Sequence, residues 1–179
     1  RIIHISTTSV YGEVVRGHFT EASPLPTSKH VYIHTKQESE RLLQEHTPQS
    51  DLIILRPGSI CAEEQSYWGD RQVERMKATD LITWVHPDDV VPWIHTDNLA
   101  EMIILAATKA QDGDIFNAID ANLPEADFRM KLIEASGKPV QVPDRSAEQA
   151  TFSNDRIKQL GYVPIRTPGS TVEHLVKSF

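Results

Sequence analysis

The chain has 179 residues, of which 39% are hydrophobic and 24% are charged, as expected for one globular domain with a core of its own. Its 18 basic residues against 25 acidic ones give a net charge of −7. Because Lys and Arg form no cluster and no apolar run approaches about 18 residues, we expect no nucleic-acid or membrane partner. The lone Cys61 cannot form an internal disulfide, which favours a cytoplasmic location.

The first half of the chain predicts a strand, a helix and a second strand. Residues 2–6 are rich in Ile, as in a parallel strand that is buried on both faces. Residues 12–29 predict a polar loop, and residues 32–45 predict a helix that Pro48 closes. A second apolar run at 52–55 completes a βαβ unit, which implies a parallel sheet.

The second half alternates in the same way. Residues 62–79 are irregular, with a helix in their second half, and residues 88–94 predict a short strand. Residues 96–110 predict a helix that Thr96 or Asp97 caps, and residues 114–119 predict a further strand. A helix over 125–136 ends at Gly137, and helices over 153–160 and 170–179 complete the chain.

Tyr32 and Lys36 stand four residues apart, so they lie on one face of the expected helix. A free phenol has a pKa of about 10, and a nearby ammonium group favours its ionised form. Lowering the pKa of Tyr32 by about three would correspond to roughly 4 kcal/mol and would bring it near neutrality, where general acid/base catalysis is most effective. On its own this spacing often occurs by chance, and Tyr32 could be a half-buried aromatic and Lys36 a solvated helix residue. The catalytic interpretation therefore depends on the surrounding motifs.

A series of motifs follows in order over about residues 2–120. They are Thr7-Thr8-Ser9-Val10-Tyr11-Gly12, Tyr32-Ile33-His34-Thr35-Lys36, Arg56-Pro57-Gly58-Ser59-Ile60, Trp93-Ile94-His95-Thr96-Asp97-Asn98-Leu99-Ala100 and Gly113-Asp114-Ile115-Phe116-Asn117. In this order they resemble the extended short-chain dehydrogenase/reductase family, which includes the NAD-dependent sugar epimerases and dehydratases. Residues 152–164 also resemble the family's Leu-Gly-Tyr/Trp-x-Pro element.

This resemblance implies a doubly wound, parallel, Rossmann-type α/β sheet with a small C-terminal substrate lobe. We expect residues 1–122 to form the catalytic part of the Rossmann-type domain, and residues 123–179, helped by 62–89, to form the lobe. The eight glycines include no Gly-x-x-Gly-x-x-Gly phosphate loop. We therefore expect this loop to precede Arg1, so that the sheet is incomplete in this chain and the strand at 2–6 lacks its natural neighbour or pairs with another chain.

The resemblance also assigns chemical roles to individual residues. Thr7 would hydrogen-bond the reacting oxygen of the substrate, and Tyr32 would be the acid/base for its proton. Lys36 would bind the nicotinamide ribose and lower the pKa of Tyr32. The residues implied to bind NAD or NADP are Tyr32, Lys36, Pro57, Gly58 and Ile60. The residues implied to contact a small-molecule substrate are Thr7, Thr8, Ser9 and Ser59.

Some positions depart from the nucleotide-sugar members of the family. Ser59 replaces a frequent Asn, and Val91-Pro92-Trp93 replaces a segment whose Arg meets a phosphate. Thr8-Ser9 stand where the 4,6-dehydratases have an Asp-Glu pair. We therefore favour an NAD(P)-dependent oxidoreductase or epimerase that transfers hydride at a secondary alcohol or ketone. A nucleotide-sugar epimerase and a non-catalytic NAD(P)-binding regulatory relative are the alternatives.

The remaining expectations concern partners. His30 and His34 have no third ligand at a suitable spacing, so we expect no metal. The sequence does not decide the oligomeric state, and a homodimer is one possibility.

Overall fold

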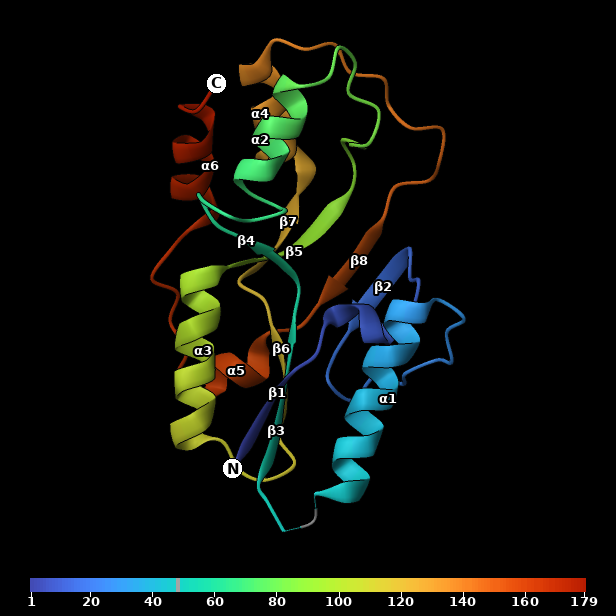
Figure 1. Ribbon diagram of the computed structural model, residues 1–179, viewed down its shortest axis with the longest axis vertical. Helices are drawn as coiled ribbons and strands as arrows, with labels where there is room; N and C mark the ends of the chain where they lie inside the picture. Colours follow the sequence, from blue (N-terminus) through green and yellow to red (C-terminus); the bar gives the residue numbers. More distant parts are fainter. Residues whose placement is uncertain (48) are drawn as a thin grey trace.

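A parallel sheet with the strand order β1-β3-β6 forms the lower part of the molecule (Figure 1). The computed structural model describes residues 1–47 and 49–179, so Pro48, expected to close the first helix, lies outside the described residues. The three strands are β1 (Ile2–Ile5), β3 (Leu52–Pro57) and β6 (Ile115–Ala118). Among the described strands, β1 pairs with β3 alone and is therefore an edge strand, as expected.

Helices cover both faces of this sheet, which is why every residue of β3 is buried (Figure 1). On one face, Ile53 and Leu55 pack with Met102 of α3 (Thr96–Lys109) and Ile157 of α5 (Asp155–Gln159). On the other face lies α1 (Val31–His46), with a buried ion pair to Arg56 beneath it. This confirms the expected Rossmann-type α/β arrangement.

A separate pair of strands lies beside the carboxyl end of that sheet. β2 (Arg16–Phe19) pairs in parallel with β8 (Gln149–Phe152). The expectation that 12–29 is wholly a loop is therefore wrong for the residues of β2. Its partner strand lies far along the chain, and local sequence patterns do not predict such a long-range pairing. Between β1 and β2, a short 3-10 helix, η1 (Thr8–Tyr11), turns the chain.

The upper part of the molecule in Figure 1 has a sheet and a core of its own. β4 (Ser59–Cys61) runs parallel to β5 (Val90–His95), which pairs antiparallel with β7 (Ala121–Pro124). Around it lie η2 (Glu125–Asp127) and the helices α2 (Asp70–Lys77), α4 (Arg129–Ser136) and α6 (Pro168–Val176). Trp93, Phe128 and Leu132 are fully buried there.

Some helix boundaries differ from expectation. His95 caps α3 by accepting a hydrogen bond from the Asp97 backbone N–H, in place of Thr96 or Asp97. The expected helix over 125–136 is interrupted at Phe128, where ψ is −93°, and becomes η2 and then α4. Gly137 does end α4, in the left-handed conformation with φ of 63°. Within the described residues, no helix is long and apolar enough to cross a membrane.

Candidate active site

The expected site residues lie where β1 and β3 reach their carboxyl ends. β1 leads into Thr7 and η1, and β3 leads through Gly58 into β4. Because β1 and β3 are parallel neighbours, both turns open on the same edge of the sheet. Ligands of open α/β sheets bind at this edge.

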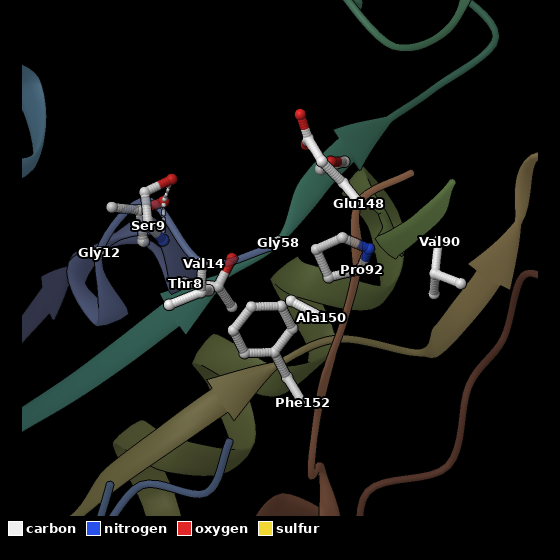
Figure 2. A pocket seen from close by; sticks show the side chains of 12 residues that line it. Thr8, Ser9, Gly12, Val14, Gly58, Val90, Pro92, Glu148, Ala150 and Phe152 are labelled. Carbon is white, nitrogen blue, oxygen red and sulfur yellow. Dashed lines mark hydrogen bonds between the residues drawn. The ribbon is translucent and has the colours of Figure 1, made fainter. Parts of the chain in front are cut away.

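A pocket of about 190 Å³ lies at this edge, between η1 and the strands of the upper sheet (Figure 2). In Figure 2, η1 with Thr8 and Ser9 lies on one side of the pocket, and Pro92 with Glu148 lies on the other. The lining residues include several that the sequence singled out, namely Thr7, Thr8, Ser9, Gly58 and Ser59. The fold therefore brings together two motifs that are about fifty residues apart in the chain.

Thr7 is both a capping residue and a wall of this pocket. Its hydroxyl oxygen accepts a hydrogen bond from the Ser9 backbone N–H at 3.2 Å, which caps η1. The same hydroxyl donates to the Ser9 hydroxyl at 3.2 Å. Thr7 is only 8% exposed, so its rotamer is fixed by local contacts before any ligand arrives.

Gly58 allows β3 and β5 to approach each other closely. A Cβ atom at this position would lie 2.0 Å from the Pro92 carbonyl oxygen and 2.9 Å from Ile119 Cγ2. No side chain fits there, so Gly58 contributes only backbone atoms to the pocket wall.

Of the five expected cofactor residues, Gly58 lines the pocket, whereas Tyr32, Lys36, Pro57 and Ile60 do not. Pro57 is buried at the end of β3, and Ile60 is 36% exposed in β4.

Lys36 lies on α1 beside the carboxyl end of β1. Its ammonium group donates a hydrogen bond to the Ile5 carbonyl oxygen at 3.0 Å. The neighbouring Gln37 side chain donates to the Val10 carbonyl oxygen at 2.7 Å. These contacts hold α1 against both β1 and η1, so the helix stands next to Thr7.

Tyr32 lies on the first turn of α1 and is 49% exposed. It does not line the pocket, and no hydrogen bond joins its hydroxyl to another of the described residues. Its neighbour Ile33 lines an adjoining cavity of about 340 Å³. That cavity shares Ser9, Gly12, Val14 and Glu148 with the first. The Tyr/Lys helix therefore borders the pocket through this shared wall.

The sequence did not indicate the far wall of the pocket. The wall comes from β5 and from the segment that enters β8, and its residues are Val90, Pro92, Glu148, Ala150 and Phe152. The residues of β8 alternate between polar and apolar, but four residues are too short a pattern to predict a strand, and the pairing with β2 places them here. The sequence places Pro92 in the segment that replaces a phosphate-binding Arg, but it does not predict that Pro92 lines the pocket.

An ion pair anchors the segment that carries Glu148. The Arg145 guanidinium donates to the two carboxylate oxygens of Asp89 at 3.0 and 2.6 Å, and the Glu148 backbone N–H donates to the same carboxylate at 2.8 Å. Burial by itself would raise the pKa of the Asp89 carboxyl, but these hydrogen bonds hold that pKa below its usual value.

A helix-covered parallel sheet with a hydroxyl-lined pocket at its carboxyl edge defines a Rossmann-type α/β protein. The chain belongs to the NAD-dependent epimerase/dehydratase family, whose model matches residues 1–118. The resemblance to the extended short-chain dehydrogenase/reductases is thereby confirmed. A comparison with curated proteins finds no match.

Solved structures share the fold at low sequence identity. A dTDP-glucose 4,6-dehydratase from Streptomyces venezuelae with NAD and TYD bound is 23% identical, with a TM-score of 0.80 over 98% of this chain and 58% of that one. A UDP-glucuronic acid 4-epimerase from Bacillus cereus, in complex with UDP-glucuronic acid and NAD, is 20% identical, with a TM-score of 0.77 over 98% and 60%. RMD from Pseudomonas aeruginosa, complexed with NADPH, is 17% identical, with a TM-score of 0.72 over 98% of this chain and 65% of that one. The chain thus spans 58% to 65% of these structures.

Proposed function

We propose that this chain carries the proton-transfer site of an NAD(P)-dependent oxidoreductase or epimerase that acts at a secondary alcohol or ketone. The observation that carries the proposal is the gathering of hydroxyl groups in one pocket beside the Tyr32/Lys36 helix. Family membership supports a nicotinamide-dependent reaction.

Within this proposal, each of the chain's site residues has a separate role in the reaction. Thr7 would turn its hydroxyl proton from the Ser9 hydroxyl to the reacting oxygen of the substrate, and Ser59 and Thr8 would orient its neighbouring groups. Tyr32 would give or take the hydroxyl proton, and Lys36 would favour its ionised form. A small-molecule substrate fits the confined pocket, and a cytoplasmic location and a homodimer stay predictions.

The residues present fit a nicotinamide ring. The pocket volume of about 190 Å³ is below the roughly 300–1,000 Å³ of a whole ligand site, so it would hold only the reacting parts of the substrate and of the nicotinamide ring, which would both extend beyond it. Next to Thr7, the buried Ser6 hydroxyl has no hydrogen-bond partner within the described residues, although Ser6 does not line the pocket. The residues that would hold the cofactor are Tyr32, Lys36, Pro57, Gly58 and Ile60. When bound, NAD or NADP would supply or accept the hydride.

A nucleotide-sugar epimerase is the second candidate, because solved structures of this fold hold such ligands. Against it, no Lys or Arg is found among the described residues that line the pocket, and Pro92 stands in the segment that replaces the phosphate-binding Arg of the nucleotide-sugar members. A diphosphate would therefore lack charge-assisted contacts there. A non-catalytic relative is less well supported, because the Thr, Tyr and Lys are all present.

The decisive experiment replaces Tyr32 by Phe in the protein that carries this chain. We expect kcat to fall about 10²- to 10⁴-fold, because Phe has no proton to transfer. Turnover of secondary alcohols, ketones and nucleotide sugars is measured with NAD and with NADP.

Tyr67→Phe is the matched control, since Tyr67 is also exposed but precedes α2 and is not on the helix that borders the pocket, and it should keep parental activity. Unchanged turnover in Tyr32→Phe would refute the proposed function.

A further inference from the structure

A buried ion pair lies directly beneath the Tyr32/Lys36 helix. Glu40 of α1 is 2% exposed and Arg56 of β3 is 3% exposed. The Arg56 Nε and Nη2 atoms donate to Glu40 Oε1 and Oε2 at 3.0 and 2.7 Å. This is the bidentate geometry in which a guanidinium fixes both the distance and the orientation of a carboxylate.

The ion pair extends into a network across the sheet face. Arg56 Nη1 donates to the Tyr11 hydroxyl oxygen at 2.9 Å, and that hydroxyl donates to Asn117 Oδ1 at 2.7 Å. The guanidinium carbon also lies 5.0 Å from the centre of the Tyr11 ring. The network therefore ties together α1, β3, η1 and β6.

The network holds α1, which carries Tyr32 and Lys36, and it reaches the residues next to Thr7 and Gly58. Glu40 follows Lys36 by one helical turn. Arg56 stands two residues before Gly58, and Tyr11 ends the 3-10 helix that Thr7 caps. A change in the Arg56–Glu40 geometry would therefore move α1, η1 and the β3–β4 turn relative to one another.

Stability alone does not explain two charges buried at this place. Removing charges from water costs several kcal/mol per ion, and an apolar pair of similar volume is often as stabilising or more so. What an apolar pair cannot provide is direction. Apolar side chains slide past one another, whereas two parallel hydrogen bonds set one register between a helix and a strand.

We propose that the Arg56–Glu40 pair, with Tyr11 as its link to η1, is a positioning unit that sets Lys36 and Tyr32 against Thr7. The inference rests on the proposed function, because it assigns the pair to that proton-transfer site. Its effect is on the geometry of the reaction and not on substrate binding.

The main test is the double variant Glu40→Leu/Arg56→Met, in the protein that carries this chain. The apolar pair should keep the unfolding midpoint close to the parent, because the buried volume is filled. We expect kcat to fall about 10- to 100-fold while KM changes less than about threefold, since small misplacements of reacting groups strongly slow chemistry. A folded double variant with parental kcat would overturn the proposal.

Arg56→Lys separates geometry from charge. Lys keeps the positive charge but has no planar fork, so the bidentate register is lost. We expect a similar loss of kcat in this variant, and Tyr11→Phe should lower kcat in the same direction. If the double variant does not fold, Arg56→Lys and Tyr11→Phe test the proposal in its place. Parental kcat in both single variants would overturn the proposal.

Arg41→Gln serves as the matched control. Arg41 lies on the same helix and pairs with Glu38 and Glu45 at the surface, so its loss should leave kcat unchanged. Tyr32→Phe is measured in parallel to distinguish the two failures. If Tyr32→Phe is inactive while the ion-pair variants are fully active, only the positioning role falls. If Tyr32→Phe is fully active, the proposed function falls, and this inference with it.

Discussion

At the scale of single residues, Gly58 shows how the pocket depends on a missing side chain. The Pro92 carbonyl oxygen occupies the space that a Cβ would need, so Gly58→Ala forces β3 and β5 apart. We expect the free energy of unfolding to fall by about 1–3 kcal/mol, as for other overpacked sites. Denaturant unfolding followed by circular dichroism measures this change.

Gly169→Ala is the natural comparison. Gly169 lies in α6, and a Cβ there meets nothing within 4 Å. Alanine should therefore keep or slightly raise stability, because Gly169 lies in the first turn of α6, where the helix propensity of Ala counts less than in a helix interior. Equal effects at the two glycines would contradict the close approach at Gly58.

At the scale of elements, Asp89 joins the start of β5 to the segment that precedes β8. The pKa of Asp89 is lowered in the folded protein. Its ion pair with Arg145 therefore stabilises the fold at pH values above 3.8, the usual pKa of an Asp carboxyl. This contribution is lost as the pH falls through the lower folded-state pKa. We expect the stability difference between the parent and Asp89→Asn to be constant above about pH 5 and to shrink below about pH 4.

Thermal unfolding at a series of pH values measures this difference. Asp88→Asn is the control, because Asp88 is exposed and takes no part in the ion pair with Arg145. Its unfolding curve should follow the parent at every pH. A stability difference for Asp89→Asn that persists to pH 2 would show that the ion pair is not the cause.

At the scale of the whole molecule, the C-terminal segment connects the hydrophobic core of the lower sheet with that of the upper sheet. α5 and Tyr162 pack with β3 and α3, whereas α6 packs in the upper core. The expected division into residues 1–122 and 123–179 stays a prediction. The later part contributes to both cores.

Asn98 holds the connecting segment between α5 and α6. Fully buried at the start of α3, it donates to Asp120 and to the Arg166 carbonyl, and it accepts from the Ile165 and Arg166 backbone N–H groups. Asn98→Ala leaves these partners unsatisfied, so we expect a loss of about 2–4 kcal/mol of unfolding free energy. Chemical denaturation measures this loss.

Thr108→Ala, at the exposed end of the same helix, is the control and should change stability by less than about 0.5 kcal/mol. An equally mild effect of Asn98→Ala would mean that the connection does not depend on Asn98.

The sequence by itself determined the βαβ order, the family and the residues that end β1 and β3, because periodicity, turn residues and short motifs are local signals. Thr7 and Ser59 could be placed in one site on this basis, since parallel strands share a carboxyl edge.

Only the tertiary structure decided the far wall of the pocket and the buried network. The pairing of β2 with β8 brings Glu148 and Phe152 to the site across more than a hundred residues. Nothing in the local pattern around Glu40 and Arg56 indicates that the two meet. Their contact arises only when α1 packs on the sheet, because burial and hydrogen bonding between distant residues are properties of packing and not of local sequence.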